Sequence, residues 1–309
     1  MAARLRRSPT YACRYLGYGK QVSQPSRAHS SANIAVITVA PNGCEPLAAP
    51  DMNFGFSEYA LAEFRKTNRH QDNRMPASPP SRPSAPINNI LAALPRADMR
   101  RIEGALDPVA LTFGNILYEQ DAVMKYVYFP NNSLVSLLKV VDRRLALEVG
   151  MVGFEGIVGF TFALGVATAP LRAMVQGAGT AMRMKATLFR EEFQRCLPLQ
   201  NQVYLYSHAL ISQVSQTAAC NRFHVVEARL ARWLLMTGDR VRSNEFRLTH
   251  EFLSDMLGVR RVGVTNAAHA LKQQGLIEYN RGDIAIVNRR GLEKASCSCY
   301  TKLWAPTIN

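Results

Sequence analysis

The segment LSDMLGVRRVGVTNAAHALKQQGLI, residues 253–277, limits what this chain can fold into more than any other stretch. It holds two short runs of apolar residues at helical spacing, with Gly258 between them and Gly275 after the second. Glycine readily takes the left-handed backbone conformation that ends a helix, so the pattern predicts two helices joined by a tight turn. The flanking sequence decides whether they form a plain helical hairpin or part of a larger module.

The flanking elements extend this helix pair on both sides. An amphipathic helix is predicted at VVEARLARWLLMTGDRV, residues 225–241, with a stop at its Gly-Asp pair, and the short strand FRLT leads to Thr249 as a helix N-cap. Downstream, GLIEYNRGDIAIVN predicts two strands around a turn with Arg281 at its tip. Helix, helix, turn, helix and hairpin is the order of a winged helix-turn-helix module, which we place at residues 222–291.

The outward face of the second helix carries groups that can bind DNA. In a helix-turn-helix this helix lies in the major groove with its first residues toward the base edges. Arginine can bind guanine, and asparagine adenine, through paired hydrogen bonds, whereas hydroxyls and helix N-termini hold phosphates. The alternative is a solvated face on a small helical bundle. The residues predicted to contact DNA are Thr249, Arg260, Arg261, Val262, Thr265, Asn266, Lys272 and Arg281.

The distribution of charge agrees with a polyanionic partner. Residues 222–309 carry 14 Lys and Arg against 8 Asp and Glu, a net charge of +6, whereas residues 87–221 carry 12 against 10, a net charge of +2. Residues 1–86 carry 11 Lys and Arg against 5 Asp and Glu, a net charge of +6, and the three segments together give the total of +14. A basic C-terminal region favours a nucleic acid, because neutralising its phosphates releases counterions.

Residues 87–185 predict an antiparallel β-roll of the jelly-roll kind, so that the whole fold is α+β. Runs such as VALTFGNILYE and KYVYFPNNSLVSLLKVV are rich in β-branched and aromatic residues and are separated by Gly, Asn and Asp turn signals. Residues 186–221 change to a helical period and predict a long linker helix.

One face of the linker helix is predicted to join two subunits. Its apolar seam recurs at spacings of 3, 4, 4 and 3 residues. Such a seam needs a partner, and we interpret it as the contact of a homodimer, as in a two-stranded coiled coil. Packing on the β-roll of the same chain is the alternative. The seam consists of Val203, Tyr206, Leu210, Val214 and Thr217.

Neither end of the chain is assigned to one of the predicted domains. Residues 1–86 are rich in Arg, Ser and Pro and predict a disordered arm or a start codon placed too far upstream. An organelle transit peptide is the remaining alternative. Residues 292–309 are interpreted as a C-terminal tail.

Residues 248–293 resemble the C-terminal domain of the Crp/Fnr transcription regulators. The family pattern runs LT, LA, LG and R before the recognition helix, then GLI and RG with a β-wing, and Leu248, Thr249, Gly258, Arg261 and Gly282 are among the matches. The resemblance covers roughly residues 88–300. It implies a cytoplasmic homodimeric regulator that binds near-palindromic double-stranded DNA, with RNA polymerase as a further partner.

The same resemblance implies which residues read DNA and which sense a signal. Arg261 falls on the base-reading arginine, but Val262 stands where glutamate is common, so the preferred DNA site should differ. The roll would be of the cyclic-nucleotide-binding type. Gly159 matches the cassette glycine, yet Phe160 takes the glutamate position and Arg172 lies twelve residues beyond it, where about ten are usual.

We therefore expect cyclic AMP to bind weakly or not at all. Phenylalanine cannot bond a ribose hydroxyl, and a buried phosphate needs a close cation. Any effector site in the roll is expected to include Glu155, Gly159 and Arg172.

The cysteines predict free thiols and a reducing compartment. They stand at positions 13, 44, 196, 220, 297 and 299, without the spacing of a disulfide framework. Cys13 and Cys44 lie too far apart for the tight cysteine group of an iron–sulfur cluster. Cys297 and Cys299 could supply two metal ligands, but no second pair stands near them in sequence. We interpret both as plain thiols in a C-terminal helix and expect no metal and no cofactor.

Other classes of protein are disfavoured. No window reaches the roughly 18 consecutive apolar residues of a membrane-spanning helix. The chain has no nucleophile elbow, no Walker loop and no paired carboxylates beside a histidine, so an enzyme is not expected. The remaining alternative is a ligand-binding signalling protein without a sequence-specific role on DNA.

Overall fold

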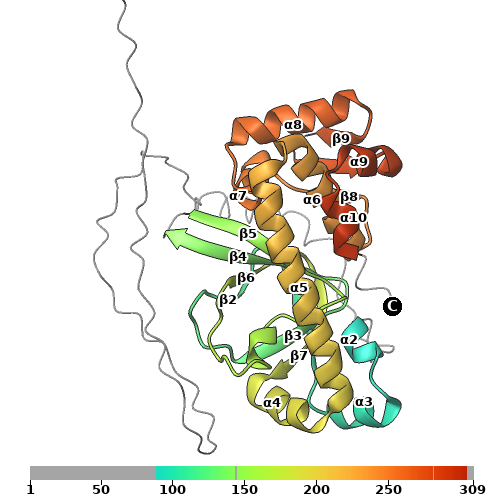
Figure 1. The fold of residues 1–309 in the computed structure, drawn as a ribbon. Coiled ribbons are helices and arrows are strands. Elements are labelled where there is room, and N and C mark those ends of the chain that lie inside the picture. Colours follow the sequence, from blue (N-terminus) through green and yellow to red (C-terminus); the bar gives the residue numbers. More distant parts are fainter. Residues whose placement is uncertain (1–87, 143–144, 281, 305–309) are drawn as a thin grey trace, which may run out of the picture. The chain divides into compact units, whose positions relative to one another are not determined.

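The computed structural model describes residues 88–142, 145–280 and 282–304. Within this part the predicted α+β fold is confirmed: an antiparallel roll, a long helix and a winged helix-turn-helix follow one another along the chain (Figure 1). The interpretation of residues 1–86 and the wing-tip role of Arg281 lie outside the described residues. None of the described helices is both long and apolar enough to cross a membrane.

The roll consists of two antiparallel sheets, ordered β1-β7-β3 and β2-β6-β4-β5. Two short helices, α2 (Asn89–Ala92) and α3 (Arg96–Glu103), precede it, and the 3-10 turn η1 (Phe160–Phe162) interrupts it. Its strands are β1 (Asp107–Leu111), β2 (Ile116–Tyr118), β3 (Tyr126–Pro130), β4 (Leu134–Asp142), β5 (Leu145–Val152), β6 (Arg172–Gly177) and β7 (Gly179–Lys185).

Helices α4 (Ala186–Arg195) and α5 (Leu197–Phe223) follow the last strand of the roll. Pro198 lies in the first turn of α5, where its missing N–H has no partner to lose. The roll core continues into both helices, because Phe189 of α4 and Leu199 of α5 are buried in the same apolar cluster as Phe129 of β3.

The predicted subunit seam on α5 packs on the roll of its own chain, so its assignment to a dimer contact was wrong. Val203, Tyr206 and Leu210 belong to the roll core. The Tyr206 ring lies so close to Gly156 that a Cβ there would stand 2.2 Å from it. Val214 is half-buried and Thr217 is buried. The physical reason is that α5 has apolar residues on more than one face, and this seam faces its own chain: its first part covers the roll, and Thr217 is bonded to Arg232 of α6.

The C-terminal region has the predicted order of elements. Strands β8, β10 and β9 form a small antiparallel sheet, which is the wing. The elements are α6 (Val226–Val241), β8 (Glu245–Arg247), α7 (His250–Leu257), α8 (Arg261–Gln273), β9 (Ile277–Asn280), β10 (Asp283–Ile286), α9 (Arg289–Ala295) and α10 (Cys299–Trp304).

Two local predictions in this region need correction. Helix α6 does not stop at its Gly-Asp pair but continues to Val241, and Arg242 takes the left-handed conformation after it, with φ of 54°. The supposed tail contains the end of α9 and the whole of α10, and Cys297 lies between these helices. Leu292 of α9 is fully buried in the domain core, so burial of apolar surface stabilises helix here.

A second apolar core joins the roll to the C-terminal domain. Leu138 of β4 and Met151 of β5 are buried in the same cluster as Trp233 and Leu234 of α6. The same cluster contains Leu253 of α7 and Val264 of α8. Helix α6 therefore lies between the sheet β2-β6-β4-β5 and the helix-turn-helix.

Candidate nucleic-acid interface

Helix α7 has the predicted residue at each end, Thr249 before it and Gly258 after it. The Thr249 hydroxyl accepts a hydrogen bond from the Phe252 amide at 3.1 Å, as an N-cap does. Gly258 ends α7 with φ of 61°, a conformation that favours glycine. The chain then enters α8 with Arg260 as its N-cap residue.

Helix α8 has one anchored face and one exposed face, as predicted. Val264, Ala267, Ala268 and Leu271 are buried in the domain core. The opposite side chains are exposed: Arg260, Arg261, Val262, Thr265, Asn266 and Lys272. The structure thus brings these predicted DNA-binding residues of α8 onto the solvent side of one rigid helix.

The first turn of α8 is suited to bind an anion. The Arg260 side chain makes no capping hydrogen bond, so it leaves the amides of Arg261 and Val262, the first two of the helix, without a side-chain cap. Helix N-termini carry a partial positive charge and bind phosphates. No ion pair within the described part of the chain engages Arg260 or Arg261. Both guanidinium groups are therefore available to an external acceptor.

Two residues of α8 are tied to neighbouring elements instead. Thr265 Oγ1 donates to the Arg261 carbonyl and lies 3.0 Å from His250 Nδ1, and the His250 ring stacks on Tyr279 at 4.2 Å. Lys272 Nζ donates to the Tyr279 carbonyl at 3.2 Å and lies 3.5 Å from Glu278. Lys272 thus holds α8 against the wing strand β9.

His250 was missed by sequence reasoning. Its pKa is lowered by burial first and by the nearby Arg261 charge second, which favours the neutral imidazole. A neutral ring can bond Thr265 and stack on Tyr279 without repelling Arg261. The sequence shows only that His250 follows the N-cap Thr249, and a histidine at that position does not by itself predict contacts with Thr265 and Tyr279.

The family comparison matches this part of the chain. Residues 228–295 match the model of the Crp-like helix-turn-helix domain. The C-terminal domain is Crp-like. No curated protein matches the sequence.

Solved structures extend the likeness to the roll and the long helix. A transcriptional regulator of the Crp/Fnr family from Eubacterium rectale has a TM-score of 0.54 at 16% identity, over 67% of this chain and 97% of that one. FixK2 from Bradyrhizobium japonicum has a TM-score of 0.54 at 14% identity, over 62% of this chain and 98% of that one. A Crp/Fnr regulator from Thermus thermophilus has a TM-score of 0.52 at 18% identity, over 62% of this chain and 98% of that one. The resemblance to Crp/Fnr regulators is thereby confirmed, by the family match in the C-terminal domain and by fold elsewhere.

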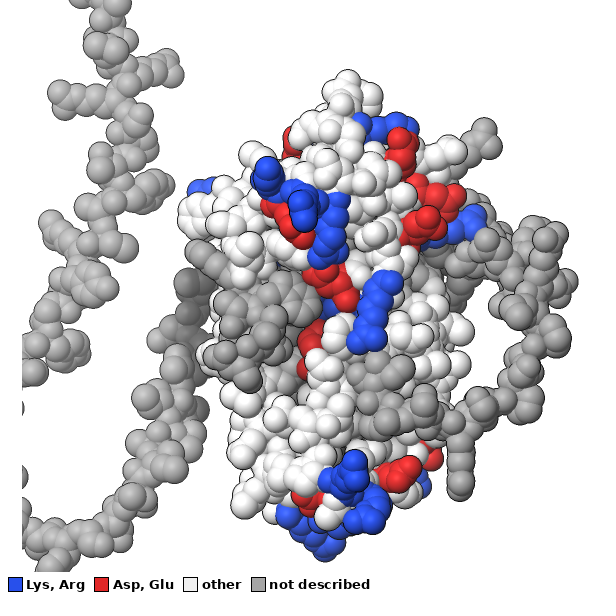
Figure 2. All heavy atoms as spheres, turned by 90° about the vertical axis from the view of Figure 1, so that its right-hand side faces the viewer, with Lys and Arg blue, Asp and Glu red and all other residues white. Residues whose placement is uncertain are grey.

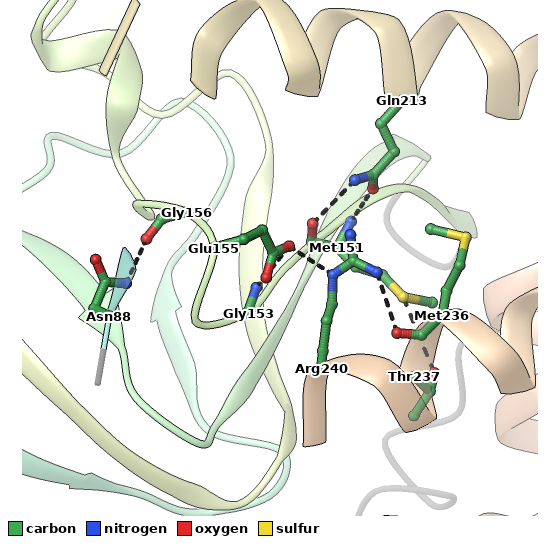
Figure 3. Close-up of polar contacts among 9 residues, drawn as sticks. All are labelled: Asn88, Met151, Gly153, Glu155, Gly156, Gln213, Met236, Thr237 and Arg240. Atoms are coloured by element: carbon green, nitrogen blue, oxygen red, sulfur yellow. Dashed lines mark hydrogen bonds and ion pairs between the residues drawn. The ribbon is translucent and has the colours of Figure 1, made fainter. Parts of the chain in front are cut away.

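The Crp-like domain is bound to the roll through buried polar contacts. Figure 3 shows the Glu155 carboxylate, beyond the end of β5, pointing toward Arg240 of α6. Arg240 Nε lies 2.7 Å from Glu155 Oε1. Both side chains are buried, at 8% and 5% exposure, so little solvent screens the pair. Gln213 of α5 bonds both main-chain groups of Met151, at 2.6 and 3.3 Å. The roll, α5 and α6 therefore meet around the end of β5.

Glu148 of β5 makes a second buried link to α6. Its carboxyl group accepts from Trp233 Nε1 at 2.8 Å and is bonded to Ser136 Oγ at 2.6 Å. Burial raises the pKa of Glu148 to about 7, although the bonds from Ser136 and Trp233 lower it. Ser136 Oγ is also bonded to the Gln176 carbonyl oxygen. One hydroxyl proton cannot serve two acceptors, so a protonated Glu148 that donates to Ser136 satisfies this network.

The three expected effector residues have separate surroundings. Glu155 is paired with Arg240, and Arg172 is paired with Glu119 at 2.6 Å in a partly exposed ion pair. Gly159 has φ of 96° and precedes η1. The partners of Glu155 and Arg172 lie in different parts of the fold, on α6 and after β2, which does not resemble a shared site for a phosphate.

The β4–β5 hairpin forms a cavity with the turn of the Crp-like domain. A cavity of about 260 Å³ lies between Leu147 of β5 and the α7–α8 turn. A Cβ added at Gly258 would stand 2.6 Å from Leu147 Cδ1. The hairpin thus rests on the backbone that orients α8, a contact between distant segments that no local pattern predicts.

Both signs of charge occur on the α9 side of the molecule. Figure 2 shows Lys and Arg side chains beside Asp and Glu side chains on that face. Arg289 of α9 is paired with Asp239 and Glu293, and Arg101 of α3 is paired with Asp98 and Glu192. Unlike Arg289 and Arg101, neither Arg260 nor Arg261 at the start of α8 has an ion-pair partner in the described part of the chain.

Proposed function

We propose that this chain is a homodimeric transcription regulator that reads near-palindromic DNA with α8. The observation that carries the proposal is the exposure of Arg260, Arg261 and Asn266 on a helix whose other face is fixed in the core of a Crp-like domain. Arginine and asparagine are the side chains that bind guanine and adenine with paired hydrogen bonds. Val262, which is 61% exposed, would contact a thymine methyl group.

The second face of α5 supports a dimer. Leu197, Tyr204 and Ile211 recur every seven residues and are 69%, 50% and 59% exposed. Two exposed polar residues lie on the same side of the helix: His208, between Tyr204 and Ile211, and Ser215, one turn after Ile211. A seven-residue repeat is the pattern of a two-stranded coiled coil, so we place the subunit contact on this face.

Dimerisation would set the spacing of the two recognition helices. In a two-fold dimer they would enter successive major grooves about 34 Å apart. The DNA site would then be an inverted repeat, each half read by Arg260, Arg261 and Asn266 of one subunit. RNA polymerase remains the expected further partner.

The sensor roll is proposed to act on α8 through α6. A signal that changes β5 would alter the Glu155–Arg240 pair and the Glu148–Trp233 bond, which hold α6. Such a change shifts the balance between two arrangements of the Crp-like domain.

The effector is proposed to differ from cyclic AMP. Phe160 stands at the family's glutamate position and packs edge-on against Tyr206, with ring centroids 6.4 Å apart. The hydroxyls of Tyr118 and Tyr206 are buried without a hydrogen-bond partner in the described part of the chain, and burial raises both pKa values. Two protonated hydroxyls suit a neutral polar ligand better than a phosphate. Micromolar binding of cyclic AMP in titration calorimetry would contradict this.

Selection of bound duplexes from randomised DNA tests the proposed function. The full chain should enrich an inverted repeat with half-sites about 10 base pairs apart, centre to centre. Enrichment of a single half-site would contradict the dimer. Recovery of DNA with no enriched sequence would contradict sequence-specific reading and would favour a signalling protein that has no sequence-specific role on DNA.

A further inference from the structure

A cluster of four metal-binding side chains lies outside the proposed DNA interface. Cys220 and His224 stand one helical turn apart, at the last turn and the C-cap of α5. Cys297 follows α9, and Cys299 begins α10. Their ligand atoms, three Sγ and one imidazole nitrogen, all lie within 4.8 Å of one another. The whole Crp-like domain separates the two pairs in sequence, which is why the spacing of the cysteines did not reveal the cluster.

The distances suit a tetrahedral site. Zinc binds sulfur at about 2.3 Å and imidazole nitrogen at about 2.0–2.1 Å, so neighbouring ligand atoms of a tetrahedron lie roughly 3.5–3.8 Å apart. The Cys220 and Cys297 sulfurs are 3.5 Å apart, and Cys299 Sγ is 3.4 Å from His224 Nδ1. Two edges of the tetrahedron are thus nearly formed, and the remaining ones require at most about an ångström of closure.

Charges near the cluster provide a second, independent observation. Arg232 of α6 is 6% exposed, and its Nε and Nη1 atoms are buried without a hydrogen-bond partner in the described part of the chain. Its Nη2 reaches only Thr217 Oγ1, at 3.4 Å. A buried cation is costly unless an anion compensates it. Three thiolates and one neutral imidazole around a divalent ion have a net charge of −1, which would compensate Arg232.

One ligand already has an outer hydrogen bond. Gln216 Nε2, one turn before Cys220 on α5, donates to Cys299 Sγ at 2.9 Å. Amide donors to a metal-bound thiolate orient the ligand and stabilise its negative charge. The three cysteines are buried, which protects thiolates from solvent and oxidants.

We propose that Cys220, His224, Cys297 and Cys299 bind one zinc ion as a closed structural site. Three cysteines and one histidine form one of the common ligand sets of structural zinc, with no position left for a substrate. On binding, each cysteine thiol loses its proton to solvent and the thiolate coordinates the ion. The site would fasten α10, which follows the Crp-like domain, to the end of the proposed dimer helix.

The metal content of the full chain tests this proposal. Protein purified with zinc present should retain about one zinc per chain, and cobalt added to the metal-free protein should give the intense visible absorption of a tetrahedral thiolate site. Cys299→Ser should abolish the cobalt spectrum. Cys196→Ser is the matched control, since Cys196 is also buried but belongs to the roll core, and it should leave the spectrum unchanged.

A milder variant keeps the test independent of folding. Gln216→Leu retains all four ligands and should weaken cobalt binding about 10–100-fold. The proposal is overturned if the wild-type chain retains no zinc and gives no tetrahedral cobalt spectrum. It is also overturned if mass spectrometry of the protein purified without reductant finds Cys220 and Cys297 joined as a disulfide that zinc does not prevent.

Discussion

Replacing Glu148 by glutamine should stabilise the fold in a pH-dependent way. The carboxyl group is buried between Ser136 of β4 and Trp233 of α6, and burial raises its pKa from 4.5 to about 7. The folded-state pKa therefore lies above the unfolded one. Stability linked to the protonated group is present below about pH 4.5 and is lost as the pH rises through about 7. At ~1.4 kcal/mol per pKa unit, this loss amounts to about 3 kcal/mol.

Glu148→Gln removes the titration but keeps the contacts. The glutamine oxygen can accept from Trp233, and its amide can donate to Ser136. The variant should be more stable than the wild type by up to about 3 kcal/mol near pH 8, and by less than about 1 kcal/mol near pH 5. Urea unfolding at both pH values, followed by circular dichroism, measures the two differences.

The control is Glu191→Gln, which changes an exposed carboxylate on α4 and should show no such pH dependence. The reasoning would be refuted if Glu148→Gln destabilised the protein near pH 8. That result would mean that an ionised Glu148 is held by its donors and that burial does not dominate its titration.

Further variants test the subunit contact and the caps. Ile211→Glu should convert the dimer to monomers in light scattering, whereas Leu188→Glu on α4 should not, and a dimer that survives Ile211→Glu would exclude the proposed face of α5. Thr249→Ala should lower the free energy of unfolding by about 1 kcal/mol through loss of the α7 N-cap, and an unchanged urea midpoint would contradict the capping role. Arg240→Met should uncouple the roll from α6 and change DNA affinity more than Arg183→Met, which removes a partly exposed arginine of β7. Equal effects would argue against the signalling route.

The sequence predicted the Crp-like domain well because its signals are local. Gly258 and Gly275 both have positive φ, and the buried face of α8 follows from the helical period. The roll was predicted for a similar reason, since its short strands alternate with turn residues.

The failures have a common physical cause, which is long-range packing. Helix α5 is apolar on two faces, and periodicity cannot say which one meets the roll and which one is exposed. The buried ion pair of Glu155 with Arg240, far along the chain, also has no local signal in the sequence. Cys220 and Cys297 lie 77 positions apart in sequence, and their sulfurs are brought together by the fold of the domain between them.

Competitive binding of specific and random DNA tests the central claim most directly. Arg261→Ala should weaken binding to the selected inverted repeat by about 1–3 kcal/mol and relax the preference at one base position per half-site. Arg290→Ala, an exposed arginine of α9 in the same domain, should change specific binding far less. If Arg261→Ala binds the selected and random duplexes with the same ratio of affinities as the wild type, α8 does not read bases through Arg261.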